Sequence, residues 1–83
     1  MIKDVNWAVD PQRVQAFFAA QPGAQATEDG FYLEGCRVRL TAVPGTLLGK
    51  WPITRTRLCF EGEPDGVEEV YRRFFLAFLS AGG

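Results

Sequence analysis

The stretch FYLEGCRVRLTAV in the middle of the chain changes the parity of its apolar positions, and this change constrains the fold more than any other feature. Successive side chains of a strand point to opposite faces, so a single straight strand cannot bury both apolar sets. A two-residue hairpin turn at Glu34–Gly35 would pair Leu33 with Cys36 and Phe31 with Val38, which places all four on one face. A bulge within one long strand is the alternative.

The residues before this hairpin predict one strand and one helix. Residues 3–9 alternate, with Val5, Trp7 and Val9 on one side and Asp4, Asn6 and Ala8 on the other. Asp10-Pro11 is typical of an N-cap followed by a first-turn proline. We therefore expect a helix over 11–21, ended by Pro22-Gly23. Its inward side chains are Val14, Phe17 and Phe18.

The residues after the hairpin predict a loop, a strand and a second helix. Two prolines and two glycines favour a loop over 44–52, and residues 53–60 alternate as a strand. Asp65 with Glu68 fits a capping box that opens a long helix. Apolar residues at spacings of three and four then form a broad stripe: Val67, Val70, Tyr71, Phe74, Phe75 and Phe78.

These elements predict a single domain over residues 1–83, in the order β-α-β-β-β-α. The fold class is α+β: a two-layer sandwich in which an antiparallel sheet carries both helices on one face. In such a small chain we expect the seven Phe and two Trp residues to supply most of the buried surface.

Composition excludes most catalytic chemistries. The chain has no His and its only Ser is Ser80, so a Ser–His–Asp triad and a Cys–His pair are both ruled out. The two Cys residues lack the spacing of a zinc site, and no phosphate-binding glycine motif is present. We therefore lean against an enzyme and expect neither a metal nor a cofactor.

Charge and hydropathy limit which binding partners and which cellular compartment we expect. A net charge of −1 disfavours general nucleic-acid binding. No apolar run is long enough to span a membrane, and residues 1–9 lack the apolar core of a signal peptide. We expect a cytoplasmic protein with reduced thiols and no membrane association.

Arginines gather on the polar side of the predicted sheet. In the hairpin register Arg37, Arg39, Arg55 and Arg57 share the face opposite the apolar one, with Tyr32 beside Arg37. No acid lies between Gly35 and Phe60 in sequence, so we expect repulsion that other groups must neutralise. The face is then either solvated and offset by Glu34, by acids of 61–69 or by a second copy, or it binds a small anion or an acidic partner.

The second predicted helix carries more apolar surface than one sheet can cover. Phe75, Leu76 and Leu79 extend beyond the inward stripe, and we assign them to an interface with a second copy or another protein. Trp51, on the predicted loop, is a further candidate interface residue.

Two family resemblances bear on function. The α-β-β-β-α order from Pro11 to Ala81 resembles the double-stranded-RNA-binding domain, but the stretch EGEPDGVEEV is acidic where that family is basic. The terminal Gly82–Gly83 resembles sulfur carriers and other ubiquitin-like proteins, whose last carboxylate enters an adenylating active site. Those folds open with a β-hairpin and end with a strand and an extended tail. This sequence instead predicts a helix over 11–21, directly after its first strand, and a helix over its last fifteen residues.

Three functional hypotheses follow, in this order. The first is a non-enzymatic association module, acting as a homodimer or as a small subunit of a complex. The second is anion, nucleotide or acidic-partner binding through the arginine face. The third is a sulfur-carrier-like role for the terminal Gly-Gly.

Overall fold

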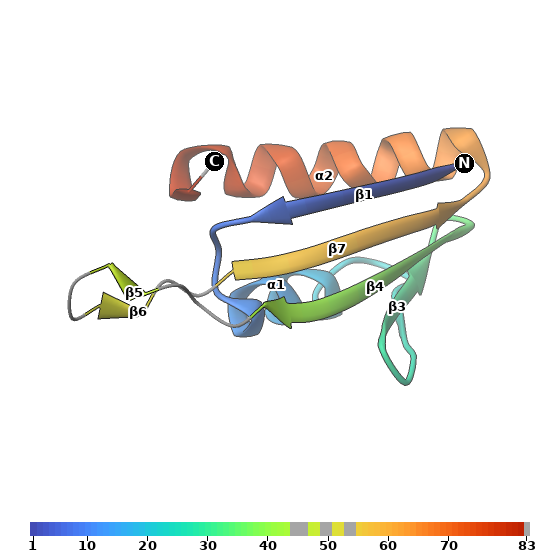
Figure 1. Ribbon diagram of the computed structural model, residues 1–83. Helices are drawn as coiled ribbons and strands as arrows, with labels where there is room; N and C mark the ends of the chain where they lie inside the picture. The colour runs from blue at the N-terminus through green and yellow to red at the C-terminus, as the bar shows by residue number, and fades with distance from the viewer. Residues whose placement is uncertain (44–46, 49–50, 53–54, 83) are drawn as a thin grey trace.

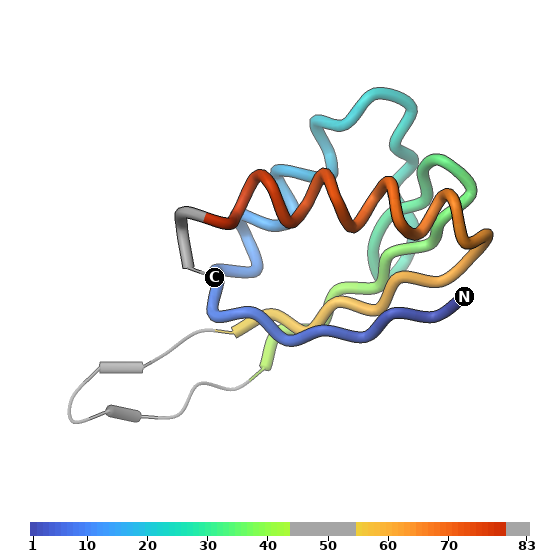
Figure 2. The backbone as a smooth tube through the Cα atoms, turned by 90° about the horizontal axis from the view of Figure 1, so that it is seen from above, coloured from blue at the N-terminus to red at the C-terminus, as the bar shows by residue number. Residues whose placement is uncertain are grey.

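The computed structural model describes residues 1–43, 47–48, 51–52 and 55–82, and the side chains of 1–43 and 55–79. Five strands form one antiparallel sheet in the order β1-β7-β4-β3-β2. Their bounds are β1 (Ile2–Trp7), β2 (Gln25–Ala26), β3 (Gly30–Leu33), β4 (Cys36–Val43) and β7 (Arg55–Gly62). Helices α1 (Pro11–Ala19) and α2 (Pro64–Gly82) lie on the same side of this sheet, as Figures 1 and 2 show. The predicted α+β sandwich with both helices on one face is confirmed.

The turn at Glu34–Gly35 joins β3 to β4 as the parity change predicts. Leu33 lies opposite Cys36 and Phe31 opposite Val38. Both turn residues have positive φ, 53° and 71°, which is the signature of a type I′ hairpin turn. The hairpin is confirmed and the bulge is not needed.

Several predicted boundaries are wrong by a few residues. β1 covers 2–7 instead of 3–9, because the chain bends at Ala8 and Val9 is buried beyond the strand end. Asp10 caps α1 as expected, accepting a hydrogen bond from the Gln12 N–H at 2.9 Å. The helix stops at Ala19, before the predicted 21. Residues 25–26, for which the sequence predicts no helix or strand, form the short strand β2 at the sheet edge.

The second half of the chain also departs from prediction. The stretch predicted as a loop, 44–52, contains two two-residue strands, β5 (Leu47–Leu48) and β6 (Trp51–Pro52), which pair antiparallel. β7 covers 55–62 instead of 53–60. Because α2 begins at Pro64, Asp65 lies within the first turn and is not the N-cap.

The core fills the space between the sheet and the two helices. α1 contributes Val14 and Phe18, while Phe17 is half-buried and packs at the margin. β7 contributes Leu58 and Phe60. α2 supplies Val67, Val70, Phe74 and Phe78 to this cluster. Thr56, the one buried polar residue among those described, donates its hydroxyl to the Val9 carbonyl at 2.8 Å.

Candidate functional site

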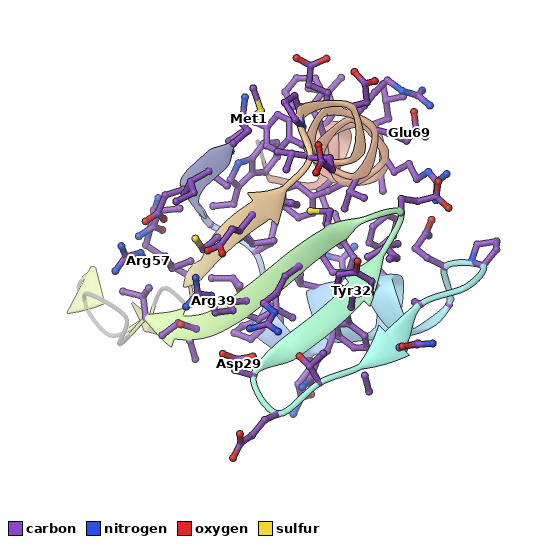
Figure 3. All side chains as sticks on the ribbon, turned by 90° about the vertical axis from the view of Figure 1, so that its right-hand side faces the viewer. Met1, Asp29, Tyr32, Arg39, Arg57 and Glu69 are labelled. Atoms are coloured by element: carbon purple, nitrogen blue, oxygen red, sulfur yellow. The ribbon has the colours of Figure 1, made fainter. Side chains whose placement is uncertain are left out.

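The face of the sheet that carries no helix holds the predicted arginines together. Arg37 and Arg39 on β4 and Arg55 and Arg57 on β7 all stand at odd positions, whereas the buried residues of these strands stand at even ones. Figure 3 shows Arg39 and Arg57 on the side of the sheet away from α2. Exposed Tyr32 on β3 lies directly opposite Arg37, as expected. We call this surface the open face.

The arginines are not opposite one another, so the expected repulsion does not arise between directly paired residues. In the register of β4 and β7, Arg37 faces Glu61, Arg39 faces Cys59 and Arg57 faces Thr41. This interleaving removes the like-charge pairs that destabilise a sheet.

Carboxylates and an amide oxygen accept hydrogen bonds from three of the four arginines. Arg57 forms a bidentate pair with Asp4 of β1, its Nη2 and Nε lying 2.6 and 3.0 Å from the two carboxylate oxygens. Arg39 Nη2 lies 2.8 Å from Glu61 Oε2, and Arg55 Nε lies 2.8 Å from Asn6 Oδ1. The hydrogen bond from Arg57 lowers the pKa of Asp4, and Asp4 in turn raises the pKa of Arg57.

Sequence reasoning found one of these acceptors and missed two. Glu61 belongs to the acidic run expected to offset the arginines, whereas Asp4 and Asn6 were not assigned that role. The alternation of the first strand already set Asp4 and Asn6 on its polar side. What the sequence does not reveal is that β1 pairs with β7, fifty residues away along the chain.

A hollow of about 340 Å³ lies over the open face. It is lined by Asp4, Arg39, Thr41, Arg57 and Cys59. Two guanidinium groups and a hydroxyl can bind a small anion, but such an anion has to compete with the carboxylates of Asp4 and Glu61 for the same donors. Anion binding here therefore stays a prediction.

The two cysteines lie on opposite faces, as the register predicts. Cys36 is fully buried, and this burial raises the pKa of its thiol, while half-buried Cys59 opens onto the hollow. They are not bonded to each other. Within the described residues, no group of three His, Cys, Asp or Glu side chains is placed to hold a metal ion.

A second surface lies where α2 passes β1. A groove of about 240 Å³ is lined by Met1, Ile2, Lys3, Val67, Glu68 and Tyr71. The Lys3 ammonium lies 4.2 Å from the centre of the Tyr71 ring, within the range of a cation–π interaction.

The predicted interface residues of α2 are exposed on the helix surface. Phe75, Leu76 and Leu79 are 36%, 58% and 52% exposed. Phe75 also contacts Trp7 edge-on, with ring centroids 5.8 Å apart. The side chain of Trp51 lies outside the described residues, so its predicted role is not tested.

Helix α2 continues through Ala81 to Gly82. Gly83 lies outside the described residues. In the described part of the chain, neither helix is long and apolar enough to cross a membrane.

Comparison with known proteins gives one family. The model of the family described as "Archaeal MoaD-like protein" matches residues 7–83. MoaD-like proteins have a β-grasp fold of the α+β class, and the present chain has that class with a five-stranded antiparallel sheet and two helices. Neither the curated proteins nor the solved structures contain a significant match.

Proposed function

The chain belongs to the archaeal MoaD-like protein family, and from this premise we propose that it is a small sulfur-carrier-like protein that works by association with partner proteins. The observation that carries the proposal is the extent of the family match, which includes Gly82–Gly83, the residues that the proposal takes as the carboxyl terminus. The Gly-Gly pair alone is weak support for a carrier role, because two neighbouring glycines are common in proteins. The family match over residues 7–83 is the stronger support.

The chemistry assigned to the terminus is a carboxylate activation followed by a sulfur transfer. A carboxylate oxygen of Gly83 attacks the α-phosphorus of ATP in the active site of an adenylating partner, and pyrophosphate leaves. Hydrosulfide then attacks the acyl carbon, so that the C–S bond forms and the C–O bond to the adenylate breaks. AMP leaves with the bridging oxygen, and the terminus becomes a thiocarboxylate. Two glycines without side chains let the terminus enter a narrow active site.

The end of α2 has to unwind for this reaction. Helix α2 runs to Gly82, whereas an adenylating site needs an extended tail. The last four carbonyls of a helix have no partner within it, and glycine is about 1 kcal/mol less favourable than alanine in a helix interior. The last turn of α2 also has no basic residue to stabilise the helix dipole. Unwinding this one turn therefore costs little.

The test is pyrophosphate exchange into ATP, catalysed by an adenylating enzyme of sulfur-carrier systems from the same organism. We expect exchange with the natural chain and none with a variant that has one alanine added after Gly83. Gln15→Ala, an exposed change on α1, is the matched control and should leave exchange intact. Equal exchange with the extended variant, or no exchange with the natural chain, would contradict the proposal.

A second candidate is binding of a small anion or an acidic partner through the open face. The hollow bounded by Arg39 and Arg57 favours it. The ion pairs of these two arginines with Glu61 and Asp4 weigh against it, because both donors already have acceptors. We therefore place it second.

A further inference from the structure

The two edge strands of the five-stranded sheet differ in length. The β2 edge is only two residues long. The β1 edge has six residues, and among the described residues only β7 pairs with β1. A strand edge with free N–H and C=O groups is a template for pairing with another strand.

The hydrogen-bond pattern identifies which groups of β1 point outward. Met1 and Gly62 exchange two hydrogen bonds, at 2.9 and 3.1 Å. Because such pairs alternate along an antiparallel ladder, odd residues of β1 bond to β7. The backbone groups of Ile2, Asp4 and Asn6 therefore face away from the sheet. Among the residues that the structure describes, only the Asn6 carbonyl has a contact there, from Arg55 Nη2 at 3.5 Å.

The apolar surface of α2 adjoins this same edge. At 100° per residue, Tyr71, Phe75 and Leu79 lie on one side of the helix, next to the buried stripe. The contacts of Tyr71 with Lys3 and of Phe75 with Trp7 show that this side faces β1. Free backbone groups and exposed apolar side chains thus form one continuous surface, which we call the β1–α2 edge.

We propose that the β1–α2 edge is the interface of a two-fold dimer, in which β1 of one copy pairs antiparallel with β1 of a second copy. A two-fold axis perpendicular to the sheet brings identical edges together with their covered faces on the same side. The two sheets then become one, and the exposed apolar sides of the two α2 helices flank the junction.

Side-chain complementarity selects one register of this pairing. The backbone groups that point outward from β1 belong to its even residues, and side chains of one face have to meet side chains of the same face. Even residues of one copy therefore lie opposite even residues of the other. Centring the axis on Asp4 places two carboxylates directly opposite each other, which is destabilising. Centring the axis on Lys3 places two ammonium groups directly opposite each other, which is also destabilising. Centring it on Val5 avoids both conflicts and pairs residues 3–7 of each strand, whereas centring it on Asn6 pairs residues 5–7 alone.

The Val5 register also creates favourable pairs. Asp4 of each copy lies opposite Asn6 of the other, and their outward N–H and C=O groups exchange both hydrogen bonds. Lys3 lies opposite Trp7 of the second copy, a cation beside an aromatic ring. The groove at Met1 and Lys3 of one copy then lies beside Leu79 of the other, since α2 runs in the same direction as β1 (Figure 1).

Two proline variants test the edge. Asn6→Pro removes an outward N–H inside the proposed register without removing a bond to β7. Ile2→Pro removes the equivalent N–H outside the register and is the matched control. By light scattering at micromolar concentration, we expect about twice the 9.2 kDa chain mass for the natural chain and for Ile2→Pro, and a monomer for Asn6→Pro. Circular dichroism should show all three folded.

Cysteine cross-linking tests the register. In a Cys59→Ser background, Val5→Cys places two thiols at the axis, where Cα atoms of a non-hydrogen-bonded pair lie about 4.5 Å apart and a disulfide forms readily. Lys3→Cys is the control, because its two copies lie roughly 14 Å apart along the strands. We expect a disulfide-linked dimer from Val5→Cys alone.

Three results would overturn the dimer: a monomeric natural chain at micromolar concentration, a dimer that Asn6→Pro leaves intact, or cross-linking of Lys3→Cys as fast as Val5→Cys. If Asn6→Pro proves unfolded, the cross-linking pair decides alone. The proposed carrier function is separate, because pyrophosphate exchange with a monomeric variant would still report activation of Gly83.

Discussion

The two faces of the sheet differ in how far their side chains are buried. On the helix-covered face, Phe18, Phe60 and Phe74 are fully buried, and their ring centroids lie 6.1 to 6.4 Å apart. On the open face, Arg57 and Asp4 form an ion pair in which about half of each side chain is exposed to solvent. Alternate residues of β4 and β7 point to these two faces of the sheet. Burial of a large apolar ring contributes about 1.5–3 kcal/mol, while exposed ion pairs contribute little. The covered face therefore contributes most of the stability of the fold, and the exposed ion pairs of the open face contribute little of it.

The largest effect is expected from removing a ring at the centre of the covered face. Phe74 is fully buried, and its ring centroid lies 5.0 Å from that of Trp7 and 5.1 Å from that of Phe78. Phe74→Ala should lower the free energy of unfolding by about 3–5 kcal/mol because it leaves a cavity. Leu76→Ala, on the exposed side of the same helix, should change it by less than about 0.5 kcal/mol. Urea unfolding of both variants measures the difference, and equal losses would contradict the assignment of faces.

A smaller loss should follow from a single methyl group at Gly66. A Cβ at this position of α2 would overlap the backbone carbonyl oxygen of Glu34 in the β3–β4 turn. Helix propensity alone predicts that Gly66→Ala stabilises α2 by about 1 kcal/mol. We expect the opposite sign, a loss of about 1–3 kcal/mol, because the turn has to move. A variant that melts above the natural chain would show that the turn does not pack on α2 in solution.

The covered face was largely predictable from sequence, and the partners of the arginines were not. Two local signals predict the buried residues: the alternation of apolar residues in the hairpin, and their spacing of three and four in α2. The burial of Phe31 in the hairpin and of Phe74 in α2 follows from these signals. The pairing of β1 with β7 depends on contacts between residues far apart in the chain, which no local period encodes. The acceptors Asp4 and Asn6 were therefore missed.

Lowering the pH should destabilise the folded protein by protonating Asp4 on the open face. Arg57 holds the pKa of Asp4 below its ordinary value of 3.8 in the folded protein. A carboxyl with a depressed folded pKa stabilises the fold above its unfolded pKa, and this contribution is lost as pH falls through the folded value. Melting temperature should thus drop less steeply below pH 4 in Asp4→Asn than in the natural chain. Glu34→Gln is the control, because Glu34 makes no ion pair within the described residues. Identical acid profiles for the natural chain and Asp4→Asn would contradict this role.

The smallest effect is expected from anions on the open face. If the hollow binds phosphate, melting temperature should rise with phosphate in a saturable way at low millimolar concentration. Because Asp4 and Glu61 compete for Arg57 and Arg39, we expect only a slight saturable rise, absent in an Arg39→Ala/Arg57→Ala double variant. A rise that grows linearly with phosphate and persists in the double variant would reflect general salt exclusion and would remove the anion site.

The most direct measurement of the central claim is the state of the terminal carboxylate in protein purified from its own cells. Cleavage after Arg73 releases the peptide that begins at Phe74 and contains no cysteine, so any thiol-specific label on it reports sulfur at the carboxyl end. The carrier account predicts that this peptide ends at Gly83 and that part of it has one oxygen replaced by sulfur. A peptide that continues beyond Gly83, or one that carries only an unmodified carboxylate while the cells' sulfur transfer is active, would contradict it.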